Sequence, residues 1–257
     1  MIVGALAVVL LASCGGRDAR SRGPRAAAAD GGAAPGPAAR ADSADSAAHL
    51  GGGGAGPQPP TPSPQTRVIV FLGTSLTAGL GLDPDEAYPA LIERRLEQRH
   101  LPWRAINAGV SGETSAGALR RLDAALREPV AILVVETGAN DGLRGLELDS
   151  TRANLEAIVR RARAVRPGLG IVLAGMEVPP NLGPRYAAAF RALFPSLAAR
   201  DGLPLIPFLL QGVGGVDSLN QADGIHPNAA GARIVADNVW RVLGPLVTAG
   251  GGARGPR

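Results

Sequence analysis

A serine, an aspartate and a histidine occur where together they could perform nucleophilic acyl transfer. Ser75 directly follows an apolar run, in a segment typical of a turn from a strand to a helix. A serine hydroxyl is a weak nucleophile and needs a base. His226 is the candidate base, and Asp223, three residues earlier, can reach imidazole Nδ1 and leave Nε2 to accept the serine proton. Each residue alone has an ordinary structural interpretation, so the prediction requires that the three side chains lie within hydrogen-bond distance of one another.

Two further positions could stabilise the negative charge that develops during acyl transfer. That charge needs hydrogen-bond donors aimed at it. Gly112 can offer its backbone N–H because no Cβ blocks a close approach, and the side-chain amide of Asn140 can offer a second donor. The N–H of Ser75 would be the third. Judged alone, Asn140 is more often a turn or capping residue.

Alternating strands and helices must position these residues. Five apolar runs are predicted as strands: Val68–Leu72, Trp103–Ala108, Val130–Val135, Gly170–Met176 and Leu203–Leu210. Helical patterns occupy Ala87–Arg99, Ala116–Leu126, Thr151–Val165 with Ser150 as N-cap, Tyr186–Arg200 and Ala229–Leu243. Near-continuous apolar runs are typical of parallel strands covered on both faces. The pattern therefore predicts a doubly wound α/β domain with helices on both sides of a five-stranded parallel sheet.

The candidate residues all lie in loops that follow these strands. Ser75 follows the first strand, Gly112 the second and Asn140 the third, while His226 follows the fifth strand and a Gly-rich loop. Open parallel sheets bind ligands outside the carboxyl ends of their strands. We therefore expect these loops to converge on one edge of the sheet.

The four segments together resemble the GDSL/SGNH hydrolases, whose hallmark residues are Ser, Gly, Asn and His in four ordered blocks. The matching positions are Ser75, Gly112, Asn140 and His226. The resemblance covers Arg67–Val247 and is closest to the bacterial multifunctional acyl-CoA thioesterase I/lysophospholipase group, also described as arylesterases. It implies a flavodoxin-like three-layer fold and a serine esterase or thioesterase that forms an acyl-enzyme on Ser75, with Asp223 as the acid of the triad. It implies no metal and no cofactor.

The same resemblance implies where an acyl chain would lie. The loop Gly142–Glu147 and the segment Val178–Asn181 would flank it. The candidate substrate-binding residues are Leu143, Leu146, Val178 and Pro179. Packing beneath loops is an equally good interpretation of the apolar ones.

The signature itself departs from the family at one position. The family's Gly-Asp-Ser-Leu reads Gly73-Thr74-Ser75-Leu76 here. Thr74 keeps a hydrogen-bonding group but removes a charge next to the nucleophile. Because the missing Asp is not a triad member, the mechanism should survive, with a different rate or pH optimum.

The first residues resemble a bacterial lipoprotein signal. Ile2–Leu11 is an apolar run too short for a bilayer span, which takes about 20 residues. It ends in Leu11-Ala12-Ser13-Cys14, which resembles a lipobox. We expect residues 1–13 to be a signal peptide and Cys14 to be lipidated, which would make the protein an exported, membrane-anchored lipoprotein facing the periplasm or the cell surface. An ordinary signal peptide with a chance cysteine is the alternative, since no arginine precedes the apolar run.

Composition predicts the remaining organisation. Residues 14–66 are rich in Gly, Ala and Pro, and a segment with so few large apolar side chains cannot offset its ordering entropy, so we expect a disordered tether. The hydrolase domain is expected at 67–247 and a flexible tail at 248–257.

Composition also excludes several functions. The chain contains no Lys, which excludes Schiff-base and P-loop chemistry, and three His with one Cys cannot form a closed Cys/His zinc site. A net charge of +4 and few aromatic residues make nucleic acid an unexpected partner, and nothing demands more than a monomer. The expected partners are a small-molecule or lipid acyl ester and a membrane. Two alternatives stay open: a carbohydrate O-deacetylase of the same family, and a binding lipoprotein without activity.

Overall fold

The computed structural model describes residues 66–250 and contains one five-stranded sheet. Its strands are β1 (Arg67–Gly73), β2 (Trp103–Gly109), β3 (Val130–Val135), β4 (Gly170–Ala174) and β5 (Leu205–Ile206). The spatial order is β2-β1-β3-β4-β5, and every neighbouring pair is parallel. The predictions for the signal peptide, for Cys14 and for the tether up to residue 65 lie outside the described residues.

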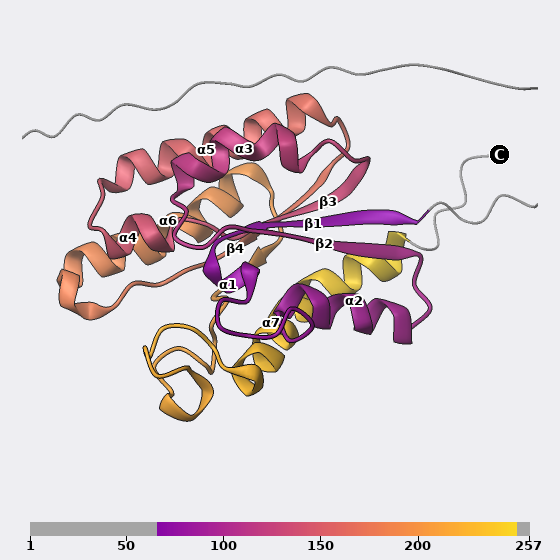
Figure 1. Cartoon of the computed structure of the whole chain (residues 1–257). Helices are drawn as coiled ribbons and strands as arrows, with labels where there is room; N and C mark the ends of the chain where they lie inside the picture. The colour runs from indigo at the N-terminus through magenta and orange to yellow at the C-terminus, as the bar shows by residue number, and fades with distance from the viewer. Residues whose placement is uncertain (1–65, 251–257) are drawn as a thin grey trace, which may run out of the picture. The chain divides into compact units, whose positions relative to one another are not determined.

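Helices cover both faces of this sheet and make three layers (Figure 1). On one face lie α3 (Ser115–Ala125), α5 (Leu148–Val165) and α6 (Pro184–Asp201), and on the other lie α2 (Tyr88–Gln98) and α7 (Ala229–Gly250). The central strands are buried on both sides, as the continuous apolar runs predict: Leu72 and Val135 have no exposed surface. Among the described residues, no helix is both long and apolar enough to cross a bilayer.

The strand order places a topological switch point between β1 and β3. From β1 the chain crosses outward to β2, and from β3 it proceeds in the other direction to β4 and β5. Ligands bind at such a point, beyond the carboxyl ends of the strands. Two short helices begin there, α1 (Ser75–Ala78) directly after β1 and α4 (Ala139–Leu143) shortly after β3.

The last two strands of the chain, β4 and the edge strand β5, are shorter than the sequence predicts. β4 ends at Ala174 rather than Met176, and β5 is confined to two residues instead of Leu203–Leu210. Prolines at 204 and 207 flank β5 and have no N–H to donate to a neighbouring strand.

Two predicted helix ends are also wrong. The helix α5 begins at Leu148, so Ser150 lies inside its first turn, and the capping residue is Glu147 with no side-chain hydrogen bond. The helix α7 continues to Gly250, past its predicted end at Leu243. Val247 is fully buried, and its carbonyl accepts a hydrogen bond from the Trp103 indole at 3.1 Å, which holds this last part of α7 against the sheet.

Candidate active site

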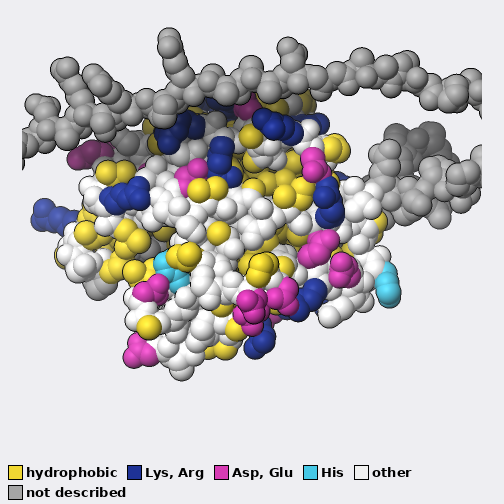
Figure 2. Space-filling model, in the orientation of Figure 1, with side chains coloured by type: hydrophobic (Ala, Val, Ile, Leu, Met, Phe, Trp, Pro, Cys, Tyr) yellow, Lys and Arg dark blue, Asp and Glu magenta, His cyan; other side chains and the backbone are white. Residues whose placement is uncertain are grey.

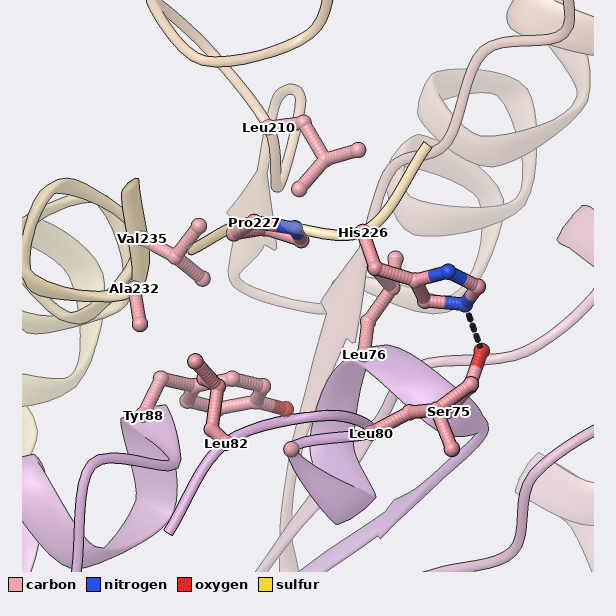
Figure 3. A pocket seen from close by; sticks show the side chains of 11 residues that line it. Ser75, Leu76, Leu80, Leu82, Tyr88, Leu210, His226, Pro227, Ala232 and Val235 are labelled. Atoms are coloured by element: carbon pink, nitrogen blue, oxygen red, sulfur yellow. Dashed lines mark hydrogen bonds between the residues drawn. The ribbon is translucent and has the colours of Figure 1, made fainter. Parts of the chain in front are cut away.

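The candidate nucleophile lies in a tight turn at the carboxyl end of β1, formed by residues 73–79 and called the nucleophile turn below. Ser75 is the first residue of α1, and Gly79 ends this helix in the left-handed conformation at φ +75°. Ser75 is 8% exposed, and its hydroxyl points toward His226 (Figure 3). The N–H of a first helical residue has no partner within its own helix. The turn therefore presents both a hydroxyl and a backbone donor at the edge of the sheet.

The structure brings Ser75, His226 and Asp223 into one hydrogen-bonded chain. His226 Nε2 lies 2.8 Å from Ser75 Oγ, and Nδ1 lies 2.6 Å from Asp223 Oδ2. The second carboxylate oxygen of Asp223 accepts the backbone N–H groups of Ile225 and His226 at 2.9 and 3.0 Å. The aspartate thus fixes both the backbone and the ring of the histidine.

Gln221 fixes the histidine loop relative to the nucleophile turn. Its side-chain amide donates to the carbonyls of Leu80 and Pro227 at 2.6 and 3.0 Å. Its backbone N–H donates to the carbonyl of His226 at 2.7 Å. Because Leu80 follows α1 directly, these bonds join the loop of His226 to the helix that begins at Ser75.

The charge state of Asp223 determines the direction of proton transfer. Three hydrogen bonds, from the His226 backbone, the His226 ring and the Ile225 backbone, lower the pKa of Asp223 to about 2. An ionised carboxylate only accepts hydrogen bonds, so Nδ1 of His226 carries a proton and Nε2 accepts the Ser75 hydroxyl. This arrangement can deprotonate a serine as it attacks a carbonyl.

Gly112 lies in the loop that follows β2, and Asn140 is the second residue of the short helix α4 that follows β3. Gly112 adopts φ +76°, which favours glycine, although a Cβ there would meet nothing closer than 4.0 Å. The amide of Asn140 donates one hydrogen to the Glu113 carbonyl at 3.0 Å, which leaves its second hydrogen for another acceptor. The positive φ at position 112, more than a lack of space for a side chain, explains why glycine occupies it.

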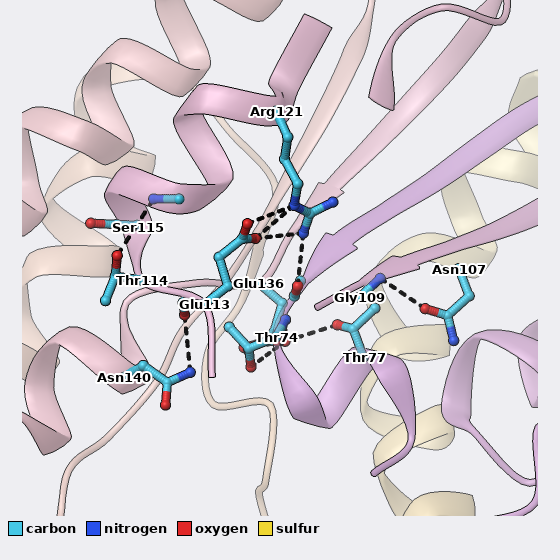
Figure 4. A network of polar contacts seen from close by, with 12 residues as sticks. Thr74, Thr77, Asn107, Gly109, Glu113, Thr114, Ser115, Arg121, Glu136 and Asn140 are labelled. Carbon is cyan, nitrogen blue, oxygen red and sulfur yellow. Dashed lines mark hydrogen bonds and ion pairs between the residues drawn. The ribbon is translucent and has the colours of Figure 1, made fainter. Parts of the chain in front are cut away.

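Arg121 joins the Gly112 loop to the nucleophile turn (Figure 4). Its Nε donates to both carboxylate oxygens of Glu113 at 2.8 and 2.7 Å, and its Nη2 donates to the carbonyl of Gly73 at 3.0 Å. Since Glu113 also holds Asn140, one network connects three of the loops at the switch point. The donors expected for an oxyanion are therefore held relative to Ser75.

The apolar residues expected along an acyl chain occupy different environments. Leu143 and Leu146 are 42% and 41% exposed on the α4 loop, and Pro179 is exposed. Val178 is buried, and its Cγ1 lies 2.3 Å from where a Cβ of Gly142 would be, so it packs beneath that loop. At the left of Figure 2, hydrophobic side chains gather on the surface over α4 and the start of α6. Only part of the predicted set thus offers surface to a ligand.

A small apolar cavity adjoins the Ser75–His226 pair (Figure 3). Its walls include Leu80, Leu82 and Leu210. Its volume of about 10 Å³ is room for roughly one water molecule. A long acyl chain would therefore lie along the surface and not inside this cavity.

Glu136 lies beside the candidate site and was not predicted from the sequence. It follows β3 directly, is fully buried, and bonds to Thr74 and Thr77 of the nucleophile turn (Figure 4). The only indication in the sequence is that a single acidic residue directly follows the apolar run Val130–Val135. Buried acids without an ionic partner are uncommon outside functional sites.

Protonation of Glu136 should make stability depend on pH. Burial raises the pKa of Glu136 from 4.5 to about 7, against the opposing effect of hydrogen bonds from Thr74 and Thr77. The folded state holds the proton more tightly, so this stabilisation is complete below pH 4.5 and is lost as pH rises through 7. The difference between these two pKa values corresponds to a total change of about 3 kcal/mol in the free energy of unfolding.

Glu136→Gln should abolish this dependence. We expect the free energy of unfolding of the wild type, minus that of the variant, to fall by about 2 to 3 kcal/mol between pH 5 and pH 8 in denaturant titrations. A difference that stays constant over this range would contradict the assignment.

The fold and the site geometry are those of a serine hydrolase with a doubly wound α/β fold. Residues 71–234 match the GDSL-like Lipase/Acylhydrolase family, and the chain belongs to this family. It is accordingly a hydrolase of carboxylic esters.

Named relatives and a solved structure agree with this assignment. The chain is 43% identical over 182 residues to the esterase TesA of Pseudomonas aeruginosa, covering 70% of this chain and 90% of that one. It is 36% identical over 181 residues to thioesterase 1/protease 1/lysophospholipase L1 of Escherichia coli K12, covering 70% and 84%. The crystal structure of the psychrotrophic esterase EstA from Pseudoalteromonas sp. matches with a TM-score of 0.67 at 33% identity, covering 71% of this chain and 99% of that one. These results confirm the predicted family, fold class and esterase activity.

Proposed function

We propose that Ser75 is the nucleophile of this esterase, with His226 as general base and Asp223 orienting the histidine. The observation that carries the proposal is the chain of contacts from Ser75 Oγ through the imidazole to the Asp223 carboxylate, at 2.8 and 2.6 Å. The low pKa of Asp223 supports its role as a permanent acceptor. The turn that carries Ser75 lies at the switch point of the sheet, where ligands bind.

In the proposed reaction, Ser75 Oγ attacks the acyl carbonyl while His226 Nε2 takes the hydroxyl proton. The oxyanion is held by the N–H groups of Ser75 and Gly112 and by the free amide hydrogen of Asn140. The imidazolium then protonates the leaving alcohol or thiol, and the acyl-enzyme forms. Water attacks this ester with His226 again as base, which releases the acid and restores Ser75.

We propose acyl esters and thioesters with medium or long chains as substrates. The names of the relatives include esterase, thioesterase and lysophospholipase. Exposed Leu143 and Leu146 offer an apolar surface beside the site, and the adjoining cavity is too small for a chain. The carbohydrate O-deacetylase alternative is not favoured by these relatives.

We further propose that the protein is an exported monomer anchored through a lipid on Cys14. The support comes from the apolar run Ile2–Leu11 and the Leu-Ala-Ser-Cys sequence that ends it. Metabolic labelling with palmitate should modify the wild type and leave Cys14→Ser unlabelled; equal labelling of both would exclude the anchor.

Replacing Leu143 and Leu146 together by Ser should selectively impair hydrolysis of long acyl chains. Loss of about 1.4 kcal/mol of apolar contact would lower kcat/KM tenfold for p-nitrophenyl decanoate, with p-nitrophenyl acetate changed less than twofold. Val165→Ser is the matched control, since Val165 is 45% exposed at the end of α5, at the opposite edge of the sheet. Equal losses on both esters would contradict an acyl-binding role.

A further inference from the structure

The nucleophile turn rests on a single buried carboxyl group from the neighbouring strand. Glu136 Oε2 accepts the Thr74 N–H at 2.7 Å and the Thr77 hydroxyl at 2.8 Å. The Thr74 hydroxyl donates to Glu136 Oε1 at 3.0 Å. Ser75 lies between these two threonines, so Glu136 holds the turn on both sides of the nucleophile (Figure 4).

The hydrogen bonds around Glu136 form a chain with one direction. The Tyr88 hydroxyl lies 2.7 Å from Thr77 Oγ1, and Thr77 uses its only hydrogen to bond Glu136. Tyr88 therefore donates to Thr77, which donates to the carboxyl group. All these groups are buried, and the nearby Arg121 is paired with Glu113. When its carboxyl group is ionised, above its pKa of about 7, Glu136 is thus the common acceptor of the turn.

Little free space surrounds this contact. A Cβ on Gly73 would lie 2.7 Å from Glu136 Oε2 and 1.9 Å from Thr77 Oγ1. The turn and the carboxyl group are therefore in direct contact, and a displaced Glu136 side chain would move the residues that flank Ser75.

We propose that Glu136 is the positioning residue of the nucleophile: through Thr74 and Thr77 it aims Ser75 Oγ at His226 and the Ser75 N–H at the oxyanion. This inference rests on the proposed role of Ser75. It also places a carboxyl group in direct contact with Thr74, supplied by the residue that follows β3.

The cost of burying this acid favours positioning over simple packing. Burying an ionisable group without an ionic partner is expensive, and an amide or apolar side chain would fill the same space at lower cost. Burial indeed raises the pKa of Glu136 to about 7. The Glu136 carboxyl group accepts hydrogen bonds from three donors of the turn, and these fix the turn more tightly than one hydrogen bond could. This positioning explains why a costly buried acid is present.

The test compares kcat, KM and melting temperature of the full chain for four variants at pH 8, where Glu136 is ionised, with p-nitrophenyl octanoate as substrate. Glu136→Gln keeps the shape but exchanges one acceptor for a donor, and we expect kcat to fall 10- to 100-fold with KM within twofold. Thr74→Val keeps the volume but removes the hydroxyl, and we expect a fall of about tenfold. Thr74→Ser keeps the hydroxyl and should stay within threefold of the wild type.

Trp103→Phe is the control for a purely structural effect. Trp103 is 4% exposed at the first residue of β2, and its indole donates to the Val247 carbonyl at the end of the strands opposite the nucleophile turn. It should lower the melting temperature and leave the kcat of the folded enzyme unchanged. Unchanged kcat in Glu136→Gln, equal losses in Thr74→Ser and Thr74→Val, or a matching kcat loss in Trp103→Phe would overturn the inference.

The rate of Ser75 phosphonylation by a p-nitrophenyl alkylphosphonate separates this inference from the proposed function. If Ser75→Ala is still labelled and active, the proposed function fails. If Ser75→Ala is inert but Glu136→Gln is labelled at the wild-type rate, only the positioning role fails.

Discussion

Replacing either Ser75 or His226 by alanine is expected to lower kcat by at least about 10⁴-fold, and the double variant should be scarcely slower than either single one. The reason lies in the 2.8 Å contact between Ser75 Oγ and His226 Nε2. Without the serine hydroxyl no acyl-enzyme forms for the histidine to act on, and the hydroxyl is weakly nucleophilic without the histidine. Residues that work as one unit show grossly non-additive losses.

The measurement is kcat for p-nitrophenyl octanoate in the wild type, the two single variants and the double variant. His100→Ala is the matched control, because His100 is exposed at the end of α2, and its kcat should equal that of the wild type. Losses that add in the double variant would mean that the two residues act independently, and would contradict the proposed pair.

Asn140→Ala is expected to lower kcat by roughly 10²–10³-fold with little change in KM, the usual scale for one oxyanion donor. One amide hydrogen of Asn140 is taken by the Glu113 carbonyl at 3.0 Å, which fixes the direction of the other. A donor held in place before the reaction stabilises the transition state more than the bound substrate. The loss should therefore appear in kcat.

Asn154→Ala is the control for this prediction. The Asn154 amide donates to Ser115 Oγ at 2.9 Å, and the Ser115 N–H donates to the carboxylate of Asp141, the neighbour of Asn140 in α4. Asn154 itself does not belong to the proposed oxyanion site. Its kcat should remain within threefold of the wild type. An Asn140→Ala enzyme with normal kcat, or equal losses in both variants, would remove Asn140 from the oxyanion site.

The central sheet was predictable because its strands carry a strong local signal. The central strands, which contain residues such as Leu72 and Val135, are covered on both faces of the sheet. Strands in that environment are continuous apolar runs. The edge of the sheet was less predictable, since the apolar residues after Ile206 pack in a loop. Apolar character does not distinguish a buried loop from a strand, and here prolines 204 and 207 limit the strand.

The candidate site was predictable as a set of residues but not as a geometry. The order of Ser75, Gly112, Asn140 and His226 indicated the family, whereas α1 and α4 are too short to show a helical period. The contact between Thr74 and Glu136 could not be predicted, because the two residues are 62 positions apart in the sequence. Contacts between loops of different strands depend on the register of the sheet, which local patterns do not contain.

Covalent trapping tests the central claim most directly. The protein would be treated with a p-nitrophenyl alkylphosphonate, cleaved with trypsin and analysed by mass spectrometry. Cleavage after Arg67 and Arg94 yields a peptide in which Ser75 is the only serine. We predict one alkylphosphonyl group per chain on Ser75, with loss of activity, and no adduct in Ser75→Ala. Inactivation with the adduct on another residue, or undiminished labelling of Ser75→Ala, would contradict the assignment of Ser75 as the nucleophile.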